Sequence, residues 1–248
     1  MNSSIARIAT LLTLLSATTL MAMAQPCDKD YDLLMAEYGL VDVTTLCDDL
    51  FVELRYSTED NFVGRDMYGS LERAYFEPSF AQRIVAAAEE LRRRNPELRL
   101  LIYDAARPLS VQRTMRRMVE GTSLERFVAD GTRGGRHNYG VAVDVTLARL
   151  DGTPLDMGAA FDDFTEAAAV KGTPDTAEAA SRRPEVYRSY LQTLLNKGVI
   201  SREALDNRML LIEVMHAVGL YPYRREWWHF EELMPMSETR AKYRLLEF

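Results

Sequence analysis

The chain has 248 residues, a formal net charge of −7 and 47% hydrophobic residues. This length is enough for one substantial domain and too short for two of ordinary size. The negative charge, which no basic stripe offsets, argues against a nucleic-acid-binding protein. The sequence has no internal repeat and no low-complexity block, so we expect one domain over residues 25–248.

Residues 1–24 have the features of a secretory signal peptide. Arg7 supplies a positive charge, residues 8–20 form an apolar segment, and residues 22–24 form an A-x-A cleavage site. The apolar segment is too short, and too rich in threonine and serine, for a membrane-spanning helix. We therefore expect an exported, soluble protein without a membrane span, located in the periplasm.

The two cysteines, Cys27 and Cys47, both follow the predicted cleavage site closely. In an exported chain such a pair predicts a disulfide, and two buried free thiols are the alternative. A cysteine metal site is not expected, because nothing else nearby supplies thiolates.

The hydrophobic pattern predicts helices and strands in alternation along the chain. The expected helices cover residues 28–39, 78–95, 110–120, 184–197 and 201–220, and the expected strands cover residues 50–56, 98–103 and 141–147. The helix over residues 78–95 has the clearest pattern, because Pro78 or Ser79 starts it and Asn95-Pro96 ends it. A hairpin-type turn is expected at residues 150–153.

The segment from Gly134 to Thr146 carries the most informative pattern of the sequence. A glycine-rich turn presents His137, and the alternating run that follows places Asp144 on a strand otherwise suited to burial. An unpaired buried carboxylate is costly, so Asp144 needs a partner. A metal ion close to His137 would satisfy it, and a structural ion pair or a turn-capping role are the alternatives.

The sequence contains three histidines in all. His216 lies inside the helix expected over residues 201–220, where a structural role is more common than a ligand role. The other two lie in apolar or aromatic surroundings with carboxylates nearby in sequence. A catalytic zinc ion takes three protein ligands and leaves a fourth position for water, and His137, Asp144 and His229 could supply this set.

Glu226 is the candidate general base for a water activated by that single zinc ion. One geometric objection applies, because Glu226 and His229 are three residues apart and point to opposite faces of an ideal strand. The backbone must therefore turn or bulge between them, or Glu226 must precede the strand.

Arg107 follows the strand expected over residues 98–103, and Pro108 disfavours a helix at that position. An arginine there can bind an anion or a carbonyl oxygen, or it can pair with Asp104. Serine or cysteine nucleophiles are less suited, because the sequence has no G-x-S-x-G motif. It also lacks a Walker loop and a dinucleotide-binding fingerprint.

These residues resemble a known family. The segment Arg136–Asp144 is similar to the H-x-x-G-x-A-x-D signature of zinc D,D-peptidases, and Glu226-Trp227-Trp228-His229 is similar to their E-x-W-H signature. Within that group the chain looks most like D-alanyl-D-alanine dipeptidases of the vancomycin-resistance type. Further similar stretches at residues 55–64, 104–108 and 144–162 occur in the order of the family, so the resemblance covers residues 50–232.

The resemblance implies a role for each candidate residue. The implied ligands of one zinc ion are His137, Asp144 and His229. Glu226 would be the catalytic base, and Arg107 would stabilise the oxyanion of the tetrahedral intermediate. Asp162 would hold the free ammonium group of the substrate, with a loop-capping acid as the alternative.

The resemblance also implies an α+β fold: a central antiparallel sheet flanked by helices, with zinc at one end of the sheet, in the zinc D,D-peptidase or Hedgehog-like architecture. Two features depart from the family. Gly135 occupies a position where the family usually has serine, two residues before the first zinc histidine, which puts strict D-Ala-D-Ala preference in question. The stretch over residues 165–207 is longer than expected, and its helix could reshape the mouth of the site.

The leading hypothesis is an exported zinc dipeptidase that hydrolyses D-Ala-D-Ala to two D-alanines in cell-wall peptide turnover or salvage. Antibiotic resistance fits less well, because an exported enzyme does not reach the cytoplasmic precursor pool. A D,D-carboxypeptidase or endopeptidase acting on longer peptidoglycan peptides is the alternative enzyme. A zinc-binding domain without catalysis is the alternative from another class.

Overall fold

The structure is a computed structural model that describes residues 29–170 and 184–248. Its strands are β1 (Val41–Asp42), β2 (Leu50–Val52), β3 (Tyr75–Phe76), β4 (Leu98–Asp104), β5 (Ala142–Arg149), β6 (Leu220–Pro222) and β7 (His229–Glu232). Its α-helices are α1 (Tyr31–Glu37), α2 (Pro78–Arg94), α3 (Leu109–Val119), α5 (Pro184–Asn196), α6 (Arg202–Ala217) and α7 (Met236–Lys242). Its 3-10 helices are η1 (Val43–Thr45), η2 (Arg55–Ser57), η3 (Glu125–Phe127), η4 (Arg136–Tyr139) and η5 (Glu166–Ala168).

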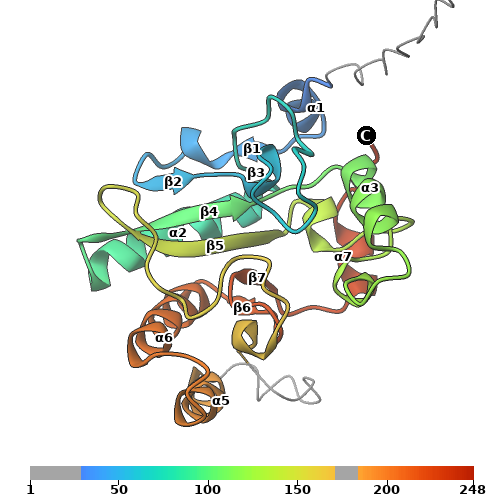
Figure 1. Cartoon of the computed structure of the whole chain (residues 1–248). Coiled ribbons are helices and arrows are strands. Elements are labelled where there is room, and N and C mark those ends of the chain that lie inside the picture. Colours follow the sequence, from blue (N-terminus) through green and yellow to red (C-terminus); the bar gives the residue numbers. More distant parts are fainter. Residues whose placement is uncertain (1–28, 171–183) are drawn as a thin grey trace, which may run out of the picture.

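The central feature of this α+β domain is a five-stranded sheet with strand order β2-β4-β5-β7-β6 (Figure 1). Strands β4, β5, β7 and β6 pair in antiparallel fashion, as expected. The expectation of an antiparallel sheet is wrong for β2, which pairs parallel to β4 with Leu50 opposite Leu100. Parallel neighbours need a long crossover connection, and here the chain between β2 and β4 runs through α2.

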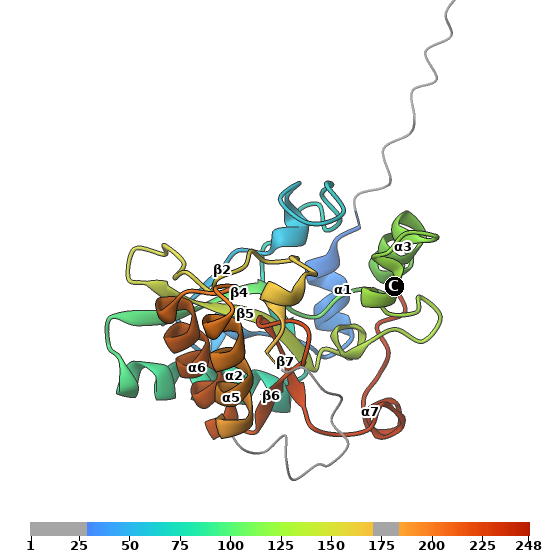
Figure 2. The same ribbon diagram turned by 60° about the horizontal axis from the view of Figure 1, so that its bottom comes forward.

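Three helices cover one face of this sheet. Helix α2 packs against β4, α6 packs against β5 and β6, and α5 packs against α6. Figure 2 shows these three helices together beneath the sheet. Helix α6 also contacts the segment that follows β5, because Arg208 donates to the Met157 carbonyl (2.6 Å). Val143, Val145 and Leu147 of β5 are all completely buried. The other face of β5 carries Asp144 and Thr146, which are also buried but line cavities.

Helix α2 illustrates how local sequence signals determine an element. The Glu77 side chain accepts hydrogen bonds from the backbone N–H groups of Ser79 (2.9 Å) and Phe80 (3.2 Å), and Pro78 occupies the first helical position. Its apolar residues Phe80, Ala81, Ile84, Ala87, Ala88 and Leu91 are buried. The helix ends at residue 94, so the predicted range of 78–95 is confirmed to within one residue.

Other expected elements are confirmed with small shifts at their ends. The helices expected over residues 28–39, 110–120, 184–197 and 201–220 correspond to α1, α3, α5 and α6. The strand expected over residues 50–56 is wrong in its second half, because the chain leaves the sheet after Val52 and turns into η2. The expected turn after β5 closes with a hydrogen bond from Arg149 N–H to the Thr153 carbonyl (2.9 Å).

Two expectations concern residues outside the described ranges. The signal peptide predicted over residues 1–24 lies there, and so does Cys27. Cys47 is half-buried, and its disulfide with Cys27 stays a prediction. Within residues 29–170 and 184–248, none of the helices combines the length and the apolar character that a membrane crossing requires.

Candidate active site

His137 lies in η4, between Gly134 and Gly140, at the entry to β5. Gly140 has a φ of +68°, and a Cβ atom there would lie 3.0 Å from the backbone nitrogen of Glu77. The turn therefore requires glycine at this position. The carbonyl of His137 accepts a hydrogen bond from the Arg107 N–H (2.9 Å), which ties η4 to the end of β4.

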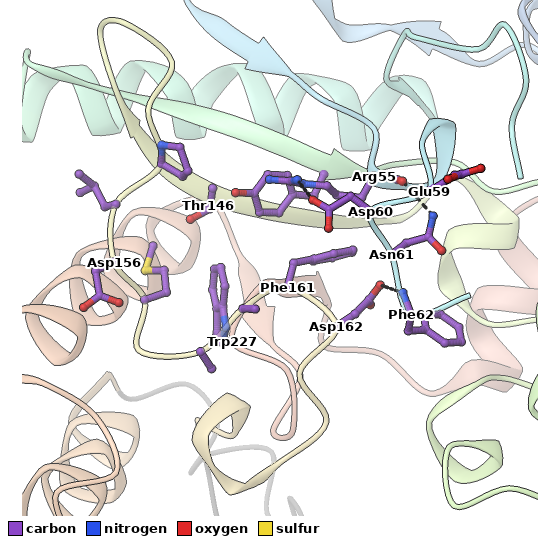
Figure 3. A pocket seen from close by; sticks show the side chains of 16 residues that line it. Arg55, Glu59, Asp60, Asn61, Phe62, Thr146, Asp156, Phe161, Asp162 and Trp227 are labelled. Atoms are coloured by element: carbon purple, nitrogen blue, oxygen red, sulfur yellow. Dashed lines mark hydrogen bonds and ion pairs between the residues drawn. The ribbon is translucent and has the colours of Figure 1, made fainter. Parts of the chain in front are cut away.

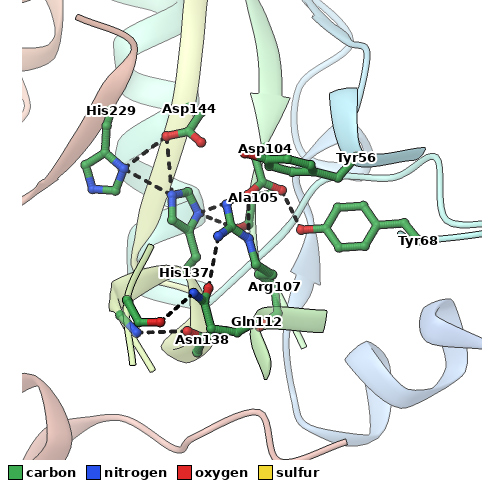
Figure 4. Close-up of polar contacts among 12 residues, drawn as sticks. Tyr56, Tyr68, Asp104, Ala105, Arg107, Gln112, His137, Asn138, Asp144 and His229 are labelled. Atoms are coloured by element: carbon green, nitrogen blue, oxygen red, sulfur yellow. Dashed lines mark hydrogen bonds and ion pairs between the residues drawn. The ribbon is translucent and has the colours of Figure 1, made fainter. Parts of the chain in front are cut away.

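The structure brings His137, Asp144 and His229 together (Figure 4). Asp144 of β5 and His229 of β7 are directly opposite each other in the sheet. The Nδ1 atom of His229 lies 3.1 Å from Nε2 of His137 and 3.0 Å from Oδ1 of Asp144, and that oxygen lies 3.3 Å from Nε2 of His137. Ligands at 2.0–2.1 Å in a tetrahedral zinc site are about 3.3 Å apart. The three atoms thus fit three corners of such a site.

The ring nitrogens that face away from this cluster also have partners. Nδ1 of His137 lies 2.7 Å from the carbonyl oxygen of Ala105, and Nε2 of His229 lies 3.0 Å from a carboxylate oxygen of Glu231. Glu231 is itself 3.0 Å from the guanidinium of Arg136. Such outer contacts hold a histidine in the tautomer and orientation that a metal needs. They leave Nε2 of His137 and Nδ1 of His229 as the metal-facing atoms.

The electrostatics of the cluster favour a cation. Burial by itself would raise the pKa of Asp144, but the two adjacent imidazoles outweigh burial and hold that pKa below its ordinary value. Burial opposes protonation of His229, yet hydrogen bonds to Asp144 and Glu231 raise its pKa to about 10. Asp144 and Glu231 together stabilise the extra proton on the His229 ring. The same negative surroundings also suit a divalent cation, which would replace that proton. The donor set therefore fits zinc in both geometry and charge.

Glu226 lies in the connection between β6 and β7. The Tyr223 N–H donates to the His229 carbonyl (2.8 Å) and the Glu226 N–H donates to the Tyr223 carbonyl (3.2 Å), so the chain turns before β7 begins. Trp227 and Trp228 are buried edge to face and anchor this turn. Glu226 precedes the strand, and the objection from ideal strand geometry does not apply. Burial raises the pKa of Glu226 to about 7.

Arg107 is buried at the carboxyl end of β4, in a network of polar side chains (Figure 4). It donates to Asp104 from Nε (3.1 Å) and Nη2 (2.5 Å), and to Gln112 from Nη1 (2.9 Å). The Tyr68 hydroxyl donates to the other oxygen of Asp104 (2.7 Å). The two roles considered for Arg107 are therefore compatible: it pairs with Asp104 and also lines the cavity described below.

Asp162 approaches the site from the segment that follows β5. Its carboxylate accepts hydrogen bonds from the Tyr56 hydroxyl (3.1 Å) and from the Phe62 N–H (3.2 Å). Both partners are at least 100 residues away in sequence, so Asp162 connects two distant segments and does not cap its own loop. Its φ of +61° is the one positive value at a non-glycine residue within the described ranges. Burial raises the pKa of this carboxyl group to about 8.

These side chains surround one cavity of about 340 Å³. The six candidate residues that line it are Arg107, His137, Asp144, Asp162, Glu226 and His229. Gly135 also lines the cavity, and a Cβ atom there would lie 3.3 Å from the Cβ of Ala129. There is therefore little space for a side chain at residue 135. With glycine there, this part of the cavity wall carries no side chain.

Some residues of the site were missed by sequence reasoning. Glu231 follows His229 by two residues, a spacing that places both on one face of a strand, and this pattern could have identified it. Tyr56 and Gln112 gave no local signal, since their roles come from contacts with Asp162 and Arg107.

His216, for which a structural role was expected, lies in the last turn of α6. Its ring is 4.6 Å from the ring of Tyr221. It is not among the residues that line the cavity around His137.

An α+β domain with this set of side chains around one cavity is typical of hydrolases, and His137, Asp144 and His229 form its candidate metal site. Comparison with known families makes the assignment specific. Residues 36–240 match the D-Ala-D-Ala dipeptidase family, and the chain belongs to this family.

Two relatives are named as dipeptidases of this kind. The D-alanyl-D-alanine dipeptidase of Escherichia coli (strain K12) is 31% identical over 193 residues, which cover 77% of this chain and 83% of the relative. The D-alanyl-D-alanine dipeptidase of Synechocystis sp. (strain ATCC 27184 / PCC 6803 / Kazusa) is 26% identical over 167 residues, covering 55% of this chain and 60% of the relative.

Proposed function

We propose that this protein is a zinc-dependent dipeptidase that hydrolyses D-alanyl-D-alanine to two molecules of D-alanine. The mutual 3.0–3.3 Å spacing of the His137, Asp144 and His229 ligand atoms carries this proposal. The names of the two relatives support the substrate. When bound, zinc lowers the pKa of a coordinated water to about 7 and polarises the scissile carbonyl.

Glu226 accepts the proton of the attacking water and delivers it to the nitrogen of the departing D-alanine. A carboxyl group with a pKa of about 7 is suited to both steps, because it can gain and lose a proton near neutral pH. The half-buried position of Glu226, on the wall of the same cavity as the metal ligands, supports this role.

Arg107 donates hydrogen bonds to the oxygen on which negative charge develops. Asp104 and Gln112 take three of its five N–H groups, so two remain for the substrate. Because its partners already hold the guanidinium in place, little reorganisation is needed during the reaction.

Asp162 binds the ammonium group of the dipeptide. The approach of a cation favours the ionised carboxylate, which burial alone disfavours. The hydrogen bonds from Tyr56 and Phe62 fix the direction in which this carboxylate points.

The proposed setting is the periplasm, where the enzyme would serve turnover or salvage of cell-wall peptides. This part of the proposal depends on export through the signal peptide predicted over residues 1–24. Fractionation of cells that express the full chain tests it, with cleavage after residue 24 as the expected result.

The activity is tested by elemental analysis of the purified protein together with D-alanine release from D-Ala-D-Ala. We expect one zinc ion per chain, loss of activity with a chelator, and recovery on addition of zinc. Activity that persists in metal-free protein would contradict the proposal.

The first prediction concerns Glu226. Glu226→Gln keeps the shape of the side chain but removes the base, so we expect normal zinc content and a kcat lower by about 10²–10⁴. The matched control is Glu97→Gln, which changes an exposed glutamate outside the cavity and should leave kcat unaltered. A normal rate in Glu226→Gln would exclude Glu226 as the base.

A further inference from the structure

Asp162 lies in the segment over residues 156–169, the Asp162 segment, whose regular secondary structure is the single turn η5. A cavity of about 670 Å³ lies between this segment and Thr146 of β5. Figure 3 shows the segment running from Asp156 around this cavity to Asp162, whose carboxylate faces Phe62. The sheet therefore gives the middle of the segment little support, and its conformation depends on other contacts.

Arg208 of α6 holds the Asp162 segment near both of its ends. Its Nε atom donates to the Met157 carbonyl (2.6 Å), its Nη2 atom to the Ala167 carbonyl (2.7 Å) and its Nη1 atom to the Ala169 carbonyl (3.2 Å). Met157 lies five residues before Asp162, and Ala167 lies five residues after it. One guanidinium group thus closes the segment into a loop with Asp162 at its centre.

Two neighbours of Arg208 on α6 fix the first end of the segment. The Asn207 side chain donates to the Asp156 carbonyl (2.8 Å). Gly158 lies directly against Ala204, because a Cβ atom added at Gly158 would be 2.9 Å from the Ala204 Cβ. The segment therefore follows α6 closely at this end, and Arg208 connects the same helix to the other end.

Arg208 is a buried cation whose three hydrogen bonds, within the described part of the chain, all go to uncharged carbonyl oxygens. It is 1% exposed. Burial lowers the pKa of Arg208 to about 10, so the side chain is still charged at neutral pH. For stability alone an apolar side chain of similar volume would serve as well, because a buried charge loses its hydration. The guanidinium adds direction instead, since its five N–H donors form a rigid plane that reaches several carbonyls at once.

The backbone at Asp162 needs support of this kind. Its φ of +61° is sparsely populated for a residue with a side chain, and such a conformation persists only where the surrounding structure determines it. Tyr56 and Phe62 hold the carboxylate from one side. Arg208 holds the backbone of the segment from the α6 side. Without the Arg208 contacts, the backbone would relax and the carboxylate would leave its position.

We propose that Arg208 is a positioning residue for substrate binding: by fixing both ends of the Asp162 segment, it holds Asp162 where it meets the ammonium group of the dipeptide. This inference rests on the proposed function, because Asp162 binds that ammonium group only if the dipeptide is the substrate. Arg208 is not among the residues that line the catalytic cavity, so it acts through the segment and not by contact with the substrate.

The experiment begins with the kinetics of two variants. Arg208→Lys keeps the charge but loses the planar set of donors, and Arg208→Gln removes the charge as well. Each should raise KM for D-Ala-D-Ala about ten-fold and change kcat less than about two-fold, because the lost ammonium contact stabilises the bound ground state and the transition state equally. Arg202→Lys is the matched control, since Arg202 is exposed at the start of the same helix, and both of its constants should equal those of wild type.

The retention of kcat is expected because the base is held by other contacts. Arg208 lies 5.9 Å from the Trp227 ring centroid, at the outer limit of a cation–π interaction. The turn that carries Glu226 is closed by its own backbone hydrogen bonds to and from Tyr223. The loss of Arg208 should therefore affect binding by Asp162 more than proton transfer by Glu226.

Two further measurements distinguish positioning from a general loss of stability. In the Asp162→Asn background, Arg208→Lys should raise KM by less than about a further two-fold, because both residues act on one contact. Hydrogen exchange of the substrate-free protein should increase more in the Asp162 segment of Arg208→Lys than in its helix α2.

The inference is wrong if both Arg208 variants keep the wild-type KM, or if Arg208→Lys has its full effect on KM in the Asp162→Asn background. An equal increase of hydrogen exchange in the Asp162 segment and in α2 would also overturn it. Failure of the proposed function is a separate result, because the wild-type enzyme would then release no D-alanine from the dipeptide. Hydrogen exchange would still show whether Arg208 holds the segment.

Discussion

Asp104 explains how Arg107 can belong to a buried ion pair and to the wall of the catalytic cavity at once. The carboxylate of Asp104 is completely buried and accepts from Arg107 and from the Tyr68 hydroxyl. The guanidinium also lies 4.9 Å from the Tyr56 ring centroid. Because the partners of Arg107 occupy only part of its donor set, the residue is rigid yet still able to bind an anion. Lysine could not replace it, because an ammonium group lacks the planar fork that reaches several acceptors at once.

The second prediction concerns the pH dependence that Asp162 imposes on stability. Its pKa is about 8 in the folded protein and near 3.9 in an unfolded chain. Between pH 4 and pH 8 the unfolded chain releases this proton whereas the folded protein retains it, so the folded state loses relative stability as pH rises. Asp162→Asn removes the titration. The Tm of the variant relative to wild type should therefore increase by several degrees between pH 5 and pH 8.

The measurement is thermal unfolding of metal-free, substrate-free protein at the two pH values. Asp151→Asn is the matched control, because Asp151 is exposed and its carboxylate accepts a hydrogen bond from the Thr153 N–H, which lowers its pKa. That residue is ionised throughout the range, so its variant should show a constant difference from wild type. A constant difference for Asp162→Asn as well would mean that burial does not raise the pKa of Asp162.

At the scale of elements, the predictions that held depend on local signals. The start of α2 at Pro78, its capping by Glu77, and its end before Pro96 all follow from neighbours in sequence. The alternation that predicted β5 is also local, and it correctly places Asp144 on the face opposite Val143 and Val145. The three metal-site residues could be proposed because each carries a distinctive side chain within such a pattern.

The features that sequence reasoning missed depend on contacts between distant residues. The parallel pairing of β2 with β4 is set by the crossover through α2, which the three residues of β2 do not encode. The bond between Tyr56 and Asp162 spans 106 residues, and its geometry depends on the packing of two loops. The turn that brings Glu226 before β7 is closed by backbone hydrogen bonds and anchored by two buried tryptophans.

The third prediction concerns Gly140, which ends η4. Its φ is +68°, and an added Cβ would lie 3.0 Å from the Glu77 nitrogen. Gly140→Ala therefore combines backbone strain with a steric clash, and we expect a loss of about 1–3 kcal/mol in the free energy of unfolding. Because η4 carries His137, the affinity for zinc should also fall. Chemical denaturation and zinc titration measure the two effects.

Gly152→Ala is the control for Gly140→Ala. Gly152 has a φ of +83°, but nothing lies within 4 Å of the Cβ that alanine would add. This variant has the strain without the clash, and it lies in the turn after β5, away from the metal ligands. It should be the less destabilised of the two and should bind zinc as wild type does. Equal effects of both substitutions on zinc affinity would show that the packing of η4 does not position His137.

In the whole molecule, the three proposed metal ligands come from separate parts of the chain. The pairing of β5 with β7 places Asp144 beside His229, and η4 adds His137 from the connection that enters β5. Residues 246–248 help to hold η4 in place. The Leu246 N–H donates to the Asn138 carbonyl (2.9 Å), and the Leu246 carbonyl accepts from Leu109 of α3 (2.8 Å). The site therefore forms only when the sheet, η4 and this segment have come together.

The fourth prediction follows from this dependence of the site on the whole fold. A metal that binds the folded protein and not the unfolded chain adds about 4 kcal/mol of stability at a free concentration 1,000 times its Kd. For a chain of this size, 1 kcal/mol corresponds to about 2–4 °C in Tm. Removal of zinc by a chelator should therefore lower the Tm of the wild-type protein by about 10 °C, and the decrease should reverse when zinc is restored.

Two histidine variants serve as the comparison. His137→Ala should show almost no response to the chelator. His216→Ala should respond as wild type does, because the His216 ring contacts Tyr221 away from the cavity. A chelator effect that survives in His137→Ala would place the metal elsewhere in the molecule, because the remaining aspartate and histidine offer too few ligands to bind zinc with comparable affinity.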